Sequence, residues 1–114
     1  MKHQMKLAQE PFLKIKTQKK IMESRLFDEK RQQINVGDFI EFAQSDNPAK
    51  IILTEVKAIY RYAAFDELFS DFPASYFGGN SKKELSKEIH KFYSGEEEKK
   101  FGVVGIKFEL ADKK

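Results

Sequence analysis

The chain has 114 residues, of which 40% are hydrophobic and 34% charged, a length and mixture typical of one folded domain with a single core. It contains no cysteine, which excludes a disulfide framework, a thiolate metal site and a cysteine nucleophile. No stretch approaches the ~20 apolar residues of a membrane-spanning helix, and no apolar run typical of a secretory signal opens the sequence. These features predict a soluble, cytoplasmic protein with one domain over residues 1–114.

The net charge of +3 is small, but it is distributed unevenly. Residues 1–33 hold nine Lys or Arg and four Asp or Glu, a net charge of +5, whereas the remaining residues sum to −2. A local excess of positive charge is typical of a surface that meets phosphate groups. The alternative is an ordinary set of solvated lysines, and charge alone does not separate the two.

The first third of the chain predicts a strand, a helix and a second strand. Residues 5–7 form the first strand, and Pro11 suits the first turn of the helix that follows. Phe12 and Ile15 would point from this helix into the core. From Lys19 onward polar and apolar side chains alternate, which predicts a strand over residues 20–27.

The middle of the chain reads as turns and strands. The composition of Asn35–Asp38 is that of a turn, and the apolar segment Phe39–Phe42 is a strand after it. A second turn, Asp46–Pro48, leads to the longest β-rich run, Ile51–Arg61. In that run Ile52, Val56, Ala58 and Tyr60 share one parity, and Leu53 and Ile59 share the other, so both faces carry bulky side chains.

Helical spacing returns after residue 64. Apolar residues at i, i+3, i+4 and i+7 predict a helix over Phe65–Phe72, ended by Pro73. The segment Ala74–Asn80 is expected to be a loop, and a capping box at Ser81 begins a helix that runs to about Tyr93. The charged run from residue 96 to 100 is expected to be solvated, and Phe101–Leu110 is a closing strand.

This count of about five strands and three helices, without βαβ regularity, favours an α+β fold around a small, curved, mainly antiparallel sheet. A polar tail is expected from about residue 111. Neither a linker nor an internal repeat divides the chain.

One cluster of charged residues deserves a functional hypothesis. Strand geometry places Glu23 and Arg25 on one face, about 7 Å apart, and Lys20 can join them from the turn before the strand. A carboxylate between two cations stays ionised and orients them, leaving their outer donors for phosphate. The alternative is a half-exposed salt bridge worth about 0 to 1 kcal/mol and without functional meaning.

The segment Gln18-Lys19-Lys20-Ile21-Met22-Glu23-Ser24-Arg25 resembles the GxKxxExR signature of the ASCH domain, named for activating signal cointegrator homology. The Pro11-Phe12 helix, the Val36–Ile40 corner and the Phe101–Ile106 strand resemble family features in the same order, so the resemblance covers nearly the whole chain. It implies a small β-barrel related to PUA domains, with a basic cleft that meets RNA or a nucleotide. Lys20, Glu23 and Arg25 match the signature, and Lys19 is a further candidate for phosphate contact.

Gln18 departs from this signature, whose first position is normally glycine. Glycine at a turn from helix to strand usually serves a positive φ, which glutamine adopts at a cost of about 1 kcal/mol. A reshaped turn would chiefly affect the reach of Lys20 into the cleft.

The resemblance also leaves an enzyme open as an alternative, acting on RNA or on a modified nucleoside. Some ASCH relatives look like acetylcytidine amidohydrolases that use a threonine where this chain has Glu23, and a carboxylate does not replace that hydroxyl. Ser24 would point to the other face. For RNA cleavage Lys20 and Glu23 are the catalytic candidates, although a carboxylate beside two cations is a poor base near neutral pH.

His3 and His90 are interpreted as surface residues. Aromatic side chains near turns could stack on bases, and the candidates are Tyr60, Tyr62, Phe65, Tyr76 and Phe77. Of these, Tyr76 and Phe77 precede Gly78-Gly79 and form a possible lid over the cleft, although a loop anchored by its own aromatic side chains is the simpler interpretation.

The sequence offers no metal-ligand pattern, no cofactor motif and no phosphate-binding loop, so no metal and no cofactor are predicted. The function predicted first is an RNA- or nucleotide-binding module, followed by an enzyme on RNA or a nucleoside. A protein-interaction module is the second alternative.

Overall fold

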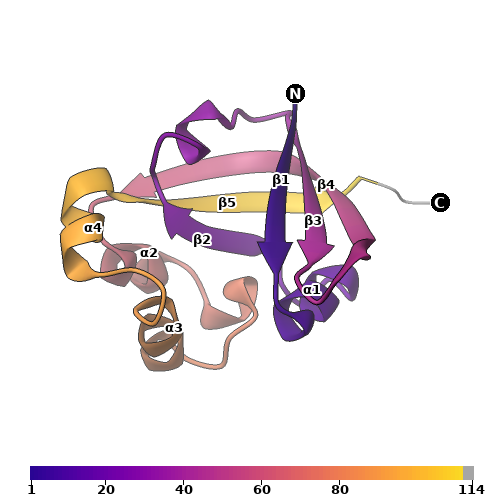
Figure 1. Ribbon diagram of the computed structural model, residues 1–114. Coiled ribbons are helices and arrows are strands. Elements are labelled where there is room, and N and C mark those ends of the chain that lie inside the picture. Colours follow the sequence, from indigo (N-terminus) through magenta and orange to yellow (C-terminus); the bar gives the residue numbers. More distant parts are fainter. Residues whose placement is uncertain (112–114) are drawn as a thin grey trace.

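The computed structural model describes residues 1–111 and contains one five-stranded sheet flanked by short helices (Figure 1). The polar tail expected from about residue 111 therefore lies almost entirely outside the described residues. The strands are β1 (Lys2–Leu7), β2 (Met22–Leu26), β3 (Phe39–Gln44), β4 (Asn47–Tyr62) and β5 (Val103–Leu110). The helices are α1 (Gln9–Lys16), α2 (Phe65–Asp71), α3 (Lys82–Ile89), α4 (Gly95–Phe101) and the 3₁₀-helices η1 (Arg31–Gln33) and η2 (Ala74–Phe77).

The strand order is β1-β3-β4-β5-β2, and β1 pairs with β3 in parallel while the other pairs are antiparallel. The sheet curls into a half-barrel, with β1 in front of the central strands (Figure 1). Its two edge strands, β1 and β2, approach closely enough for Arg25 Nη2 on β2 to donate to the Lys6 carbonyl on β1 at 3.3 Å. The predicted α+β fold with a curved, mainly antiparallel sheet is confirmed.

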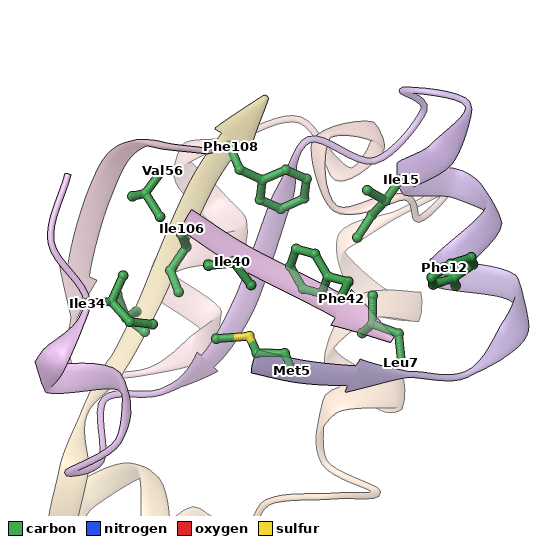
Figure 2. Packing of buried hydrophobic residues seen from close by; sticks show 11 residues of the cluster. Met5, Leu7, Phe12, Ile15, Ile34, Ile40, Phe42, Val56, Ile106 and Phe108 are labelled. Carbon is green, nitrogen blue, oxygen red and sulfur yellow. The ribbon is translucent and has the colours of Figure 1, made fainter. Parts of the chain in front are cut away.

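The concave face of this sheet holds the first hydrophobic cluster. Its side chains come from β1, α1, β3, β4 and β5 and point toward one another inside the half-barrel (Figure 2). Phe12 and Ile15 of α1 are 2% and 1% exposed, as predicted, and close one end of it. Phe42 and Phe108 lie with ring centroids 5.3 Å apart at its centre.

The convex face is covered by the chain between β4 and β5. Three side chains of α2, Phe65, Leu68 and Phe69, pack there against Met22 of β2 and Val103 of β5. Both faces of the first half of β5 are therefore covered, which explains why residues 103 to 106 are all buried.

The helical region differs from its prediction in where α3 ends and in an additional helix, α4. The helix expected to reach Tyr93 ends at Ile89, and Phe92 is 74% exposed. The charged run from residue 96 to 100 is exposed except for Glu98, in line with the expected solvation, and it forms α4. Ser94 caps this helix with a complete capping box to Glu97, and three acidic residues occupy its first turn, where the helix dipole favours them.

The long strand also differs from its prediction. It begins at Asn47 and includes Pro48, so the expected turn shrinks to the residues before it. A β-bulge lies between Val56 and Ala58, and it reverses the parity of the strand. Ile59 therefore joins the concave cluster with Val56, whereas Tyr60 faces the convex side, contrary to the expected grouping of Val56 with Tyr60.

Among residues 1–111, none of the helices has the length and apolar character that crossing a bilayer requires.

Candidate functional site

The turn from α1 into β2 determines where Lys20 lies. Thr17 is the C-cap of α1, and Gln18 follows with φ of 63°, the left-handed conformation that glycine usually serves at this position of the signature. The Lys19 amide donates to the Lys14 carbonyl at 2.8 Å and the Gln18 amide to the Ile15 carbonyl at 3.0 Å, which together make a Schellman motif. The turn thus forms without glycine, and it places Lys20 just before the start of β2.

The Lys20 ammonium is buried, with 6% of its side chain exposed. It donates to Glu23 Oε1 at 3.2 Å and to two backbone carbonyls, those of Met22 at 2.9 Å and Phe77 at 3.1 Å. Three acceptors match the three donors of an ammonium group. The structure therefore brings Lys20 to Glu23, but all of its donors point at protein acceptors.

Glu23 lies at the centre of the site with 7% of its side chain exposed. Its Oε1 accepts from Lys20 and from the Ser24 amide at 3.0 Å, and its Oε2 accepts from Arg25 Nη2 at 3.1 Å. Burial alone would raise the pKa of this carboxyl, but the charges and hydrogen bonds of Lys20 and Arg25 outweigh it and lower the pKa to about 2. Glu23 is thus ionised at any physiological pH.

Arg25 is the more accessible cation, with 16% of its side chain exposed. Its Nη2 donates to Glu23 and to the Lys6 carbonyl of β1. Burial would lower the pKa of Arg25, but Glu23 and the hydroxyl of Tyr93 raise it above its ordinary value. The guanidinium is therefore fixed between Glu23 on β2, the Lys6 carbonyl on β1 and the Tyr93 hydroxyl in the connection from α3 to α4.

The loop that contains η2 is attached to the same site. The Ile21 amide donates to the Tyr76 carbonyl at 2.8 Å, and Lys14 Nζ donates to the Gly78 carbonyl at 2.6 Å. Gly78 has φ of 80°, and a Cβ there would lie 3.2 Å from Lys20 Cβ, so this close approach suits glycine. The loop is thus a wall of the Lys20 site.

The two aromatic residues of the possible lid have different surroundings. Phe77 is 5% exposed and contacts Phe69 edge-on at 5.0 Å between centroids, so it is an anchor in the core. Tyr76 is half-buried and is the member of the pair with accessible surface. Any covering role in this loop falls on Tyr76.

The remaining sequence candidates lie apart from this centre. Lys19 is exposed, and its side chain makes no hydrogen bond or ion pair within residues 1–111. His3 bonds Asp38 at 2.8 Å and His90 bonds Glu98 at 2.7 Å, so both histidines have local partners. The side chains of Tyr60, Tyr62 and Phe65 belong to the convex cluster.

Sequence reasoning missed three contributors to the site: the Lys6 carbonyl, the Phe77 carbonyl and Tyr93. The first two are backbone groups from other elements, which leave no trace in a residue pattern. Tyr93 was assigned to the core stripe of a longer helix, and only the early end of α3 brings it toward Arg25. Within the described part of the chain no group of three or more acidic or histidine side chains could hold a metal ion.

Comparison with known proteins places this geometry in a family. The model of the ASCH domain matches residues 5–112. The crystal structure of hypothetical protein PH0355 superposes with a TM-score of 0.85 at 38% identity, covering 96% of this chain and 99% of that chain. The solution structure of protein PF0455 from Pyrococcus furiosus gives a TM-score of 0.78 at 36% identity, covering 99% of this chain and 100% of that chain.

The ASCH protein from Zymomonas mobilis shares the fold, with a TM-score of 0.67 at 14% identity over 95% of this chain and 66% of that chain. A search of curated proteins gave no match. The family model spans nearly all of the sequence, including the Gln18–Arg25 segment and the strands that position it. The chain belongs to the ASCH domain family.

Proposed function

We propose that this domain binds RNA or a nucleotide through Arg25, which Glu23 and Lys20 hold in position. The observation that carries the proposal is the state of the Arg25 guanidinium. Its Nη2 donates to Glu23 and Lys6 and the group also meets the Tyr93 hydroxyl, while 16% of this permanently charged, planar side chain remains exposed. A guanidinium restrained in this way is suited to bidentate contact with a phosphate.

The proposal assigns different roles to the signature residues. Lys20 and Glu23 act as a buried support, because the three ammonium donors and both carboxylate oxygens already have protein partners. Lys19, exposed at the turn before β2, adds a second positive charge for phosphate. The net charge of +5 over residues 1–33, and the RNA binding expected of ASCH domains, both agree with an anionic ligand.

No observation favours a reaction over binding. Glu23 has a pKa of about 2, so at neutral pH it is a very weak base. Ser24, the nearest hydroxyl in sequence, is 8% exposed and points to the opposite face of β2. We therefore do not propose turnover.

Titration of a fluorescent single-stranded RNA at several salt concentrations tests the proposal. Arg25→Ala is expected to lower affinity about tenfold or more, because a charge-assisted contact is lost, and to reduce the slope of log K against log salt by about 0.7. The affinity of Arg25→Lys for RNA should lie between those of the wild type and Arg25→Ala, since lysine keeps the charge but lacks the planar guanidinium. Lys50→Ala, which removes an exposed lysine from β4, is the control and should change little.

Circular dichroism would establish that each variant is folded. A folded Arg25→Ala protein with unchanged affinity and salt dependence would contradict the proposal. Failure of the wild-type domain to bind RNA or nucleotides at low salt would contradict it as well, and would favour the protein-interaction alternative.

A further inference from the structure

A second arginine lies on the same face of the sheet as Arg25. Arg25 on β2 is the register partner of Val104 on β5, and Val104 is also the partner of Arg61 on β4. Register partners on adjacent strands project to the same side, so Arg25 and Arg61 flank Val104 in one row. Two strand spacings place their Cα atoms about 10 Å apart.

The orientation of Arg61 is fixed by Phe27. The guanidinium carbon lies 4.1 Å from the centroid of the Phe27 ring, a close cation–π contact. Phe27 follows β2 two residues after Arg25, and its amide donates to the Gly102 carbonyl at 2.9 Å, which continues the pairing with β5. The ring is therefore held by the sheet, and it holds the guanidinium in turn.

Arg61 has no acidic partner in the part of the chain that the structure describes. It is exposed, and within residues 1–111 its guanidinium takes part in no hydrogen bond or ion pair. Exposed arginines are usually mobile or paired with a carboxylate, whereas this one is held over a ring with all five donors unused. The Arg61 guanidinium is therefore positioned to donate hydrogen bonds to a ligand.

A hollow of about 380 Å³ adjoins Arg61, at the end of the sheet where β4 ends and β5 begins. Its lining combines Arg61 with three aromatic residues, Phe27, Tyr62 and Phe101. This volume lies in the range of small-molecule sites, and aromatic side chains beside a cation are the lining that an unpaired base prefers.

We propose that the ligand is a single-stranded RNA that spans both arginines, with one phosphate at Arg25, a second at Arg61 and an unpaired base in the hollow. The inference rests on the proposed function of Arg25 and specifies its ligand class. Two cations about 10 Å apart on one face suit a chain of phosphates better than a single nucleotide. Access of a base to the hollow requires an unstacked strand, which a duplex does not offer.

The experiment compares a labelled single-stranded RNA oligonucleotide with a nucleoside monophosphate used as a competitor. Arg61→Ala should lower the affinity for the oligonucleotide about tenfold and reduce its salt slope by about 0.7, while leaving the affinity for the monophosphate unchanged. Arg61→Gln, which keeps the stem over Phe27, should reproduce both effects. Phe27→Leu should weaken oligonucleotide binding without changing the salt slope, and Lys50→Ala remains the control.

The outcomes separate the two proposals. If Arg25→Ala weakens RNA binding but folded Arg61→Ala and Arg61→Gln do not, the extended site is refuted and the proposed function stands. Equal loss of monophosphate and oligonucleotide binding in both Arg61 variants would refute the second phosphate position. Equal affinity for a duplex of the same sequence would refute the unpaired base, and absence of any RNA binding would refute both proposals.

Discussion

Replacing Glu23 by glutamine tests the electrostatic support of the site most directly. The substitution keeps the size and one acceptor of the side chain but removes its charge, which leaves the buried Lys20 ammonium and Arg25 without their shared counterion. The pKa of Glu23 is lowered from 4.5 to about 2. This difference corresponds to on the order of 3 kcal/mol of stability at neutral pH.

Urea denaturation at pH 7 should therefore show Glu23→Gln destabilised by about 3 kcal/mol, equivalent to about 12 °C in melting temperature for a domain of this size. Because the folded-state pKa is depressed, this contribution is present above pH 4.5 and is lost as the pH falls toward 2. The difference between wild type and variant should shrink over the same interval. This dependence separates an electrostatic effect from a packing defect.

The matched control is Glu88→Gln, which removes a carboxylate of the exposed pair with Lys91 and should cost about 0 to 1 kcal/mol. A Glu23→Gln protein within 1 kcal/mol of wild type at pH 7 would refute the reasoning. A large difference that persists unchanged to pH 2 would refute its electrostatic origin.

Three further predictions concern stability. Gln18→Gly should stabilise the domain by about 1 kcal/mol in urea denaturation, since Gln18 occupies φ of 63°, and no gain would mean that its side chain compensates. Glu98 raises the pKa of His90, so the stability of the domain should fall as the pH rises through that pKa. The melting temperature of His90→Gln should not show this decrease. Gly105→Ala should destabilise the domain by about 1 to 3 kcal/mol, because the added Cβ would lie 2.7 Å from Leu68 Cδ1. An unchanged stability would show that the Leu68 side chain moves to make room.

The part of the site that could be predicted from sequence is the part controlled by strand alternation. Glu23 and Arg25 share a face because they are two residues apart on one strand. The sequence left open whether Gln18 takes the positive φ of the signature glycine or reshapes the turn, and the structure has the positive φ. That all three donors of the Lys20 ammonium have acceptors within the protein could not be predicted. One of its acceptors is the carbonyl of Phe77, 57 residues later in the chain, and backbone carbonyls have no residue-type signature.

Arg61 shows the limit of period-two reasoning. Counted by alternation alone, Val56 and Tyr60 share a face, and Arg61 falls on the other. The bulge between Val56 and Ala58 reverses this relation and turns Arg61 to the concave side that carries Val56. A single extra residue in a strand leaves no composition signal here, so the row of Arg25, Val104 and Arg61 becomes visible only from the register of three strands.

The charges of the site also explain why the proposed RNA binding calls for more than one arginine. Lys20 and Glu23 neutralise each other inside the protein, so the buried support contributes no net charge to a ligand. Arg25 then supplies one positive charge, which by itself gives a weak contact with phosphate that salt screens readily. Each further phosphate contact on a single strand adds about 0.7 to the salt slope. Under the proposed function, affinity for RNA therefore accumulates along the strand, and the guanidinium of Arg61, unpaired within residues 1–111, is placed where the next contact would occur.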